Sequence, residues 1–170
     1  MTPSTMKKLV MVGSLASTAL TLYVLFGDHN WFGDRQALRF DVAELARAED
    51  GQAVFRRFPE LPLRCAVERS ALGAQACWSE IASYNDIPAR SVTFYFDGQQ
   101  RLTGWKLVTR AEHHQALRAH FEQRYGALAQ TEQAGVLSAA VAGGTLAMPA
   151  QAPGDDTEAL WLLKPAAAAR

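Results

Sequence analysis

The side chains best suited to proton transfer or metal binding lie in one segment of the chain: Glu112, His113, His114 and His120. Glutamate and histidine are common general acids and bases, so Glu112, His113 or His114 would suit a hydrolase or a lyase. Helical ligands of one metal ion lie about one turn apart, and no pair of these residues has that spacing. We therefore predict no metal site and favour a solvated helix face, with the hydrolase or lyase as the alternative.

Other catalytic and cofactor motifs are missing from the sequence. It has no Gly-x-Ser-x-Gly nucleophile elbow. The acidic residues Asp155, Asp156 and Glu158 lack the ligand spacing of a calcium-binding EF-hand. The dipeptide 143–144 lacks the further glycines of a phosphate-binding loop and predicts a hairpin turn. The sequence thus predicts no cofactor and favours a role other than catalysis.

Cys65 and Cys77 are the only cysteines, and we predict that they form a disulfide. Residues 63–69 and 76–81 have the character of two strands joined by residues 70–75. A hairpin centred there places the two cysteines opposite each other. Their spacing is not Cys-x-x-Cys, which argues against redox catalysis. Two separate buried thiols are the alternative.

Four aromatic side chains near the predicted hairpins form a candidate docking surface: Trp78, Tyr84, Tyr95 and Trp105. Tryptophan and tyrosine anchor many protein interfaces. Tyr84 belongs to the polar tract 83–88, which we expect to be a loop, and loops on a rigid scaffold often carry binding residues. Ordinary packing on the second face of a sheet is the competing interpretation, and the sequence favours it.

Two β-rich runs within residues 89–108 predict a β-hairpin that turns at the dipeptide 97–98. Its register stays open. A two-residue turn pairs Phe96 with Gln99, whereas a three-residue bulged loop pairs Phe96 with Gln100.

The clearest helix is predicted over residues 109–125. Thr109 and Glu112 have the spacing of a capping box at its start, and Gly126 stands where a left-handed residue commonly ends a helix. Its apolar residues recur at helical spacing and are expected to pack on a sheet: Leu117, Phe121, Tyr125 and Leu128.

Shorter elements complete the predicted fold. We expect two short helices, one of them capped by Asp41, and two or three further antiparallel strands. The helices fall within residues 41–50 and 52–58, and the strands within residues 135–141, 145–148 and 157–163. The sequence therefore predicts an α+β domain over residues 38–164, in which one long helix packs across an antiparallel sheet of five or six strands.

Residues 9–26 contain no charge and follow Lys7 and Lys8. As a helix they reach about 27 Å, which is enough to cross the hydrocarbon core of a bilayer. The preceding lysines favour a cytoplasmic tail over residues 1–8 and export of the rest. We therefore predict a single transmembrane helix that anchors the protein in the inner membrane.

The predicted anchor sets the expected location of the remaining chain. A linker over residues 27–37 would connect it to a periplasmic domain, and residues 165–170 would form a frayed tail. The alternative is release into the periplasm after signal-peptide cleavage near Ala19.

Charge narrows the classes of partner. The formal net charge is zero and no basic run is present, which argues against nucleic-acid binding. The expected partners are the lipid bilayer, through residues 9–26, and an envelope protein. We therefore expect an interaction or assembly module of the cell envelope. A further alternative is a small-ligand or lipid-binding protein, with residues 149–156 as a lid over the face of Phe94.

Overall fold

The computed structural model describes residues 35–46 and 50–163. Every described helix and strand belongs to one compact unit, which begins at Gln36. The predicted anchor at 9–26 and the predicted tails at 1–8 and 165–170 lie outside the described residues. Among the described residues, no helix is long and apolar enough to span a membrane.

Within the described residues, ten strands form one sheet in the order β1-β3-β5-β6-β10-β9-β8-β7, with β2 and β4 also paired to β3. β1 runs parallel to β3, and the other pairs are antiparallel. The strands are β1 (Gln36–Leu38), β2 (Arg64–Ser70), β3 (Gly73–Tyr84), β4 (Ile87–Pro88), β5 (Ser91–Phe96), β6 (Leu102–Arg110), β7 (Ala129–Gln130), β8 (Val136–Val141), β9 (Gly144–Pro149) and β10 (Asp156–Leu163).

The described helices are α2 (Val42–Leu45), α3 (Gly51–Arg57), the 3₁₀ turn η1 (Ala111–His113) and α4 (His114–Tyr125). The fold is therefore α+β with one main helix, as predicted. The prediction of five or six strands was too low, because β1, β4 and β7 have only two or three residues each and such short strands carry no periodic signal.

One face of the sheet supplies the core, and we call it the covered face. Its side chains form a row across the strands, because paired residues in neighbouring strands point to the same side. Cys77 lies opposite Phe94, Phe94 opposite Trp105, and Trp105 opposite Trp161. All four side chains are fully buried.

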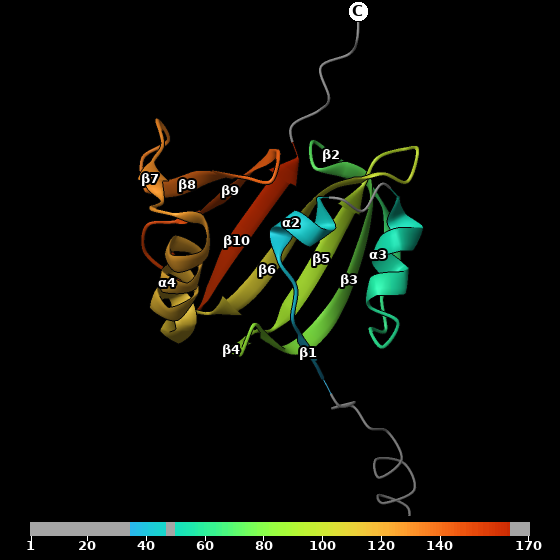
Figure 1. Cartoon of the computed structure of the whole chain (residues 1–170), viewed down its shortest axis with the longest axis horizontal. Coiled ribbons are helices and arrows are strands. Elements are labelled where there is room, and N and C mark those ends of the chain that lie inside the picture. The colour runs from blue at the N-terminus through green and yellow to red at the C-terminus, as the bar shows by residue number, and fades with distance from the viewer. Residues whose placement is uncertain (1–34, 47–49, 164–170) are drawn as a thin grey trace, which may run out of the picture. The chain divides into compact units, whose positions relative to one another are not determined.

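The helices pack on this covered face, and Figure 1 shows α2 and α4 in front of the sheet. Phe58, directly after α3, stacks on Phe94 with ring centroids 5.6 Å apart. Phe121 of α4 packs against Tyr84 at 6.2 Å. Side chains of the same chain thus fill the space over Phe94. The predicted lid at residues 149–156 is therefore not needed to cover it.

Aspartates begin the two short helices. Asp41 accepts a hydrogen bond from the amide of Ala43 at the start of α2, as predicted, and Asp50 accepts one from Ala53 at the start of α3. Each carboxylate satisfies an amide that the first helical turn leaves without a partner.

The start of α4 differs from the prediction. Thr109 is buried in β6, where it lies opposite Thr157, so it is not available as a cap. The turn η1 precedes the helix instead, and neither element has a side-chain cap at its start. The predicted end is confirmed, since α4 stops at Tyr125 and Gly126 has a φ of 90°.

The β5–β6 hairpin is confirmed, but both predicted registers are wrong. Phe96 lies opposite Leu102, and the connecting loop spans residues 97–101. Asp97 explains the longer loop, because its carboxylate accepts hydrogen bonds from the amides of Gln99 and Arg101, each at 2.9 Å. A side chain that satisfies loop amides competes with a tight two-residue turn.

Candidate functional site

The predicted acid–base residues have different surroundings. Glu112 is exposed, and its carboxylate lies 3.4 Å from His113 Nε2 at the surface of η1. His114 is buried, with Nδ1 2.9 Å from Thr157 Oγ1 and Nε2 3.4 Å from the Ala150 carbonyl. The prediction of a solvated face is therefore wrong for His114, which fastens α4 to β10. The side chains of Glu112, His113 and His114 do not line the cavity described below.

The four aromatic side chains of the predicted docking surface lie on two sides of the sheet. Tyr84 and Trp105 are fully buried in the core, with ring centroids 5.8 Å apart. Trp78 and Tyr95 alternate with covered-face residues and point to the opposite side, where Tyr95 is buried and Trp78 is 38% exposed. Of the four, Trp78 is the one that a partner can reach.

Cys65 and Cys77 form the predicted disulfide. They are direct partners in the β2–β3 hairpin, which confirms the predicted pairing of these strands. Cys65 lies at the surface, whereas Cys77 is fully buried beside Phe94.

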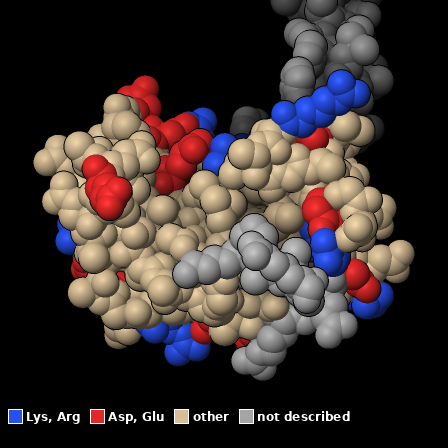
Figure 2. Space-filling view, turned by 90° about the horizontal axis from the view of Figure 1, so that it is seen from above, with Lys and Arg blue, Asp and Glu red and all other residues tan. Residues whose placement is uncertain are grey.

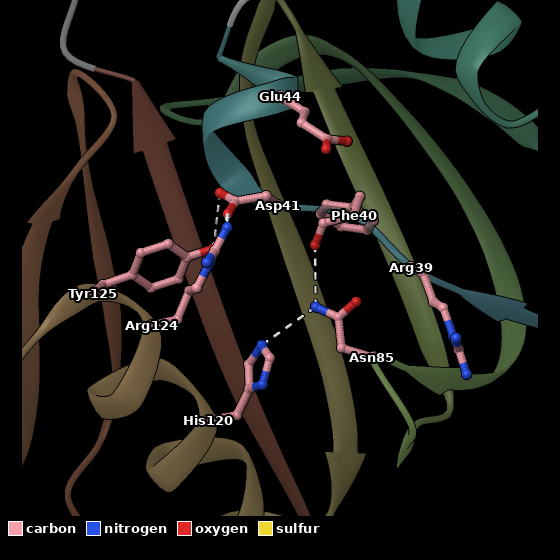
Figure 3. A pocket seen from close by; sticks show the side chains of 8 residues that line it. All are labelled: Arg39, Phe40, Asp41, Glu44, Asn85, His120, Arg124 and Tyr125. Carbon is pink, nitrogen blue, oxygen red and sulfur yellow. Dashed lines mark hydrogen bonds and ion pairs between the residues drawn. The ribbon is translucent and has the colours of Figure 1, made fainter.

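A cavity of about 420 Å³ opens between α4 and the segment that leads from β1 into α2. Figure 3 shows three parts of the chain around it: the segment 39–44, Asn85 in the turn after β3, and the α4 residues His120, Arg124 and Tyr125. We take this cavity as the candidate site, because it is concave and several polar groups converge on it.

Asp41 holds one wall of the cavity together. Its Oδ1 accepts hydrogen bonds from the Ala43 amide at 2.8 Å and the Tyr125 hydroxyl at 3.3 Å, and its Oδ2 accepts one from Arg124 Nε at 2.7 Å. Burial works to raise the pKa of Asp41, but these hydrogen bonds and the charge of Arg124 outweigh it, so the pKa lies below its ordinary value. Asp41 is therefore ionised at neutral pH and ties the start of α2 to the end of α4.

Asn85 holds a second wall. Asn85 and Asp86 have positive φ values of 46° and 68° and form a two-residue turn between β3 and β4, so the tract 83–88 is a tight hairpin and not the predicted loop. The Asn85 amide nitrogen donates to the Phe40 carbonyl at 3.1 Å and lies 3.2 Å from His120 Nε2. The turn thus brings the strand edge into contact with both α4 and the segment after β1.

His120 presents a neutral ring to the cavity. An amide nitrogen only donates hydrogen bonds, so His120 Nε2 acts as the acceptor from Asn85 and the ring proton is assigned to Nδ1. Burial lowers the pKa of His120, the charge of Arg124 lowers it further, and Asp41 opposes both effects in part. The imidazole is therefore a hydrogen-bond donor without a formal charge at neutral pH.

Tyr84 lies behind the cavity wall, with its ring edge-on to His120 at 5.7 Å. Its hydroxyl is near Tyr125 and Asn85, yet it makes no hydrogen bond of ordinary geometry within the described part of the chain. Burial raises the pKa of Tyr84, which keeps the phenol neutral. A buried hydroxyl without a partner lowers stability.

The polar groups of the cavity lining suit the binding of a ligand. Its lining contains no serine, threonine or cysteine nucleophile. Within residues 35–46 and 50–163, no group of histidine, cysteine and carboxylate side chains is placed to hold a metal ion. The lining instead combines two guanidinium groups, two carboxylates, one amide and one imidazole, which suits recognition of a small polar molecule.

Sequence reasoning considered His120 only as a metal ligand and Asp41 only as a helix cap. The residues of the cavity are 35 to 84 positions apart where they contact each other, so no motif spacing links them. One local signal was available: Asn85-Asp86 are residues that tolerate positive φ, and they stand between two β-prone runs.

No family model matches the sequence, and no curated protein or solved structure shows significant similarity to the chain.

Proposed function

We propose that the chain is a membrane-anchored interaction module of the cell envelope, which docks a partner protein on the uncovered side of its sheet. We call this side the open face, and its solvent-accessible apolar side chains are Trp78, Val108, Leu160 and Leu162. The observation that carries the proposal is Trp78, an indole 38% exposed near the middle of a twelve-residue strand.

The open face is continuous across four strands. Trp78 lies opposite Thr93, which lies opposite Lys106, which in turn lies opposite Leu160. The buried contacts of the described helices are with covered-face residues, so within the described residues no helix packs over this row. Apolar side chains gathered on a rigid, uncovered surface are typical of a protein interface.

Charge favours a protein partner over a nucleic acid. Lys106 on the open face is 3.3 Å from Glu158, so its charge is already balanced. Figure 2 shows acidic and basic side chains interspersed around the rim of the view, with uncharged surface between them. Phosphate backbones are recognised by surfaces with an excess of positive charge.

Two observations support the location. Residues 9–26 have the length and composition of a membrane anchor. The disulfide Cys65–Cys77 belongs to a class of bond that persists mainly in oxidising compartments such as the periplasm. Both are consistent with an anchored domain outside the cytoplasm.

Site-specific photo-crosslinking in intact membranes tests the proposal. A benzophenone side chain placed at Trp78 or Leu160 of the full-length chain should give a discrete adduct with another protein. The matched control is Gln123, an exposed residue on α4, on the other side of the sheet. The proposal is wrong if position 123 gives the same adducts as position 78, or if neither open-face position gives any.

A further inference from the structure

We infer that the cavity between α4 and the segment 39–44 binds a small zwitterion, namely a free amino acid or a dipeptide. It shares no residue with the open face, so the inference does not depend on the proposed docking function. The argument rests on which groups of the cavity are already satisfied, which remain available, and how their charges balance.

The wall that carries Asp41 is preformed. The carboxylate of Asp41 has hydrogen bonds on both oxygens, and the Tyr125 hydroxyl accepts from the Val42 amide at 3.2 Å while it contacts Asp41. These groups are already hydrogen-bonded to one another, so they do not need to move when a ligand binds. Preformed polar walls reduce the entropic cost of binding.

Two donors remain available for a carboxylate. Arg124 uses Nε and Nη2 for Asp41, and its Nη1 makes no hydrogen bond within the described residues. His120 uses Nε2 for Asn85, which leaves the Nδ1 proton free to donate. Arg124 and His120 both belong to α4 and line the cavity, so a ligand carboxylate has a guanidinium and a second N–H donor available to it.

Two acceptors remain for an ammonium group. Glu44 lines the same cavity, and one of its oxygens pairs with Arg57 at 2.9 Å. The amide nitrogen of Asn85 is used by Phe40, which fixes the orientation of the amide and leaves Oδ1 as an acceptor. Glu44 and Arg124 line the same cavity, so the lining offers both an acceptor and a donor to one small ligand.

The charges of the cavity lining favour a zwitterionic ligand over a simple anion. The lining contains Arg39 and Arg124 against Asp41 and Glu44, and His120 is neutral. A phosphate would bring two negative charges to a cavity with no net positive charge. A free amino acid or dipeptide brings one charge of each sign, and a cavity of about 420 Å³ lies within the range of small-molecule sites.

Calorimetric titration of the purified full-length chain in detergent tests the ligand class. The probes are alanyl-alanine, N-acetylalanine with only the carboxylate, alaninamide with only the ammonium group, and inorganic phosphate. Alanyl-alanine should bind about tenfold or more tightly than each of the other three, because it engages both poles. The inference is overturned if alanyl-alanine fails to bind at about 10 mM, or if phosphate or a singly charged probe binds as tightly.

Two variants locate the binding. Arg124→Gln should weaken alanyl-alanine about tenfold or more, whereas Arg118→Gln should leave binding unchanged. Arg118 is on the same helix and pairs with Glu122, outside the cavity lining. Glu44→Gln, at a partly exposed position, should weaken alanyl-alanine but not N-acetylalanine. Equal effects of Arg124→Gln and Arg118→Gln would refute the assignment.

A last variant separates this inference from the docking proposal. Trp78→Ser removes the exposed ring of the open face and should leave the affinity for alanyl-alanine unchanged. A loss of dipeptide binding in Trp78→Ser would place the ligand elsewhere and contradict the cavity. Loss of the crosslinked partner with full dipeptide binding would leave both assignments standing.

Discussion

Tyr84 and Tyr125 differ in how their hydroxyl groups are satisfied, although both pack in the aromatic cluster beside His120. The Tyr125 hydroxyl contacts Asp41 and accepts from the Val42 amide. The Tyr84 hydroxyl is buried with no hydrogen bond of ordinary geometry in the described chain. The contribution of each hydroxyl to stability depends on whether its oxygen has a hydrogen-bond partner, since an unsatisfied buried polar group lowers the free energy of unfolding by about 1–3 kcal/mol.

The pair makes a matched prediction. Tyr84→Phe removes a hydroxyl without a partner and should leave the free energy of unfolding unchanged or raise it by about 1 kcal/mol. Tyr125→Phe removes a bonded hydroxyl and should lower it by about 1 kcal/mol. Urea unfolding of the full-length variants measures both. A larger loss in Tyr84→Phe than in Tyr125→Phe would mean that the Tyr84 hydroxyl is bonded in solution.

His120 predicts a pH dependence of stability. Its pKa is lowered in the folded chain by burial and by Arg124, while an unfolded histidine takes up its proton near pH 6.5. Below about pH 6.5 the unfolded state therefore binds more protons than the folded state. Stability should fall as the pH drops from there, until the folded-state pKa is passed and this contribution levels off.

The measurement compares wild type with His120→Gln in urea at several pH values between about 7.5 and 5. The advantage of the wild type over the variant should shrink as the pH falls. Asp41 does not confuse the result, because its pKa is lowered below the ordinary carboxylate value and it titrates at more acidic pH. Parallel curves for the two proteins would show that His120 does not titrate differently on folding.

Single residues were the hardest part of the site to predict. His114 follows His113 directly, yet one is buried against Thr157 and the other is partly exposed beside Glu112. Sequence spacing gave no reason to treat the neighbours differently, because burial depends on where the helix meets β10. The same limit hid Asn85, whose partners Phe40 and His120 are set by the turn after β3.

At the scale of elements, prediction succeeded where a pattern repeats along the chain. The alternation in β5 and β6, the paired cysteines of β2 and β3, and the stripe of α4 all appear as expected. Prediction failed where a contact with a distant part of the chain determines whether residues join a helix or a strand. β1 forms by parallel pairing with β3, and Thr109 joins β6 because Thr157 lies opposite it.

The β2–β3 hairpin makes an asymmetric prediction. Loss of the disulfide should cost about 3 kcal/mol in either Cys65→Ser or Cys77→Ser, from the entropy of the closed loop. Cys77→Ser should cost about 1–3 kcal/mol more, because it puts a hydroxyl into the core beside Phe94. Cys65 lies at the surface and carries no such penalty.

Thermal unfolding of wild type and both variants, with and without reductant, measures the asymmetry. Reductant should lower the melting temperature of the wild type towards that of Cys65→Ser and leave both variants unchanged. Equal stability of the two serine variants would contradict the burial of Cys77. Insensitivity of the wild type to reductant would contradict the disulfide.

At the scale of the whole molecule, the proposed anchor and the disulfide bear on the same question, which is the location of the folded domain. The anchor is proposed from residues 9–26 alone, and the disulfide comes from the folded domain, yet both are consistent with the proposed export. Independent features that agree are stronger support than either alone. They also make the proposed location testable through the redox state of Cys65 and Cys77.

The full-length chain should remain in the membrane after alkaline carbonate extraction, and a reporter fused after Arg170 that folds only under oxidising conditions should be active. Deletion of residues 2–26 should hold the domain in the cytosol, where Cys65 and Cys77 should become reactive to thiol reagents after denaturation. Release of the intact domain into the periplasm would favour cleavage near Ala19 over retention. An inactive reporter, or an oxidised pair in the cytosolic deletion variant, would break the link between the anchor, the disulfide and an envelope role, because export would then explain neither feature.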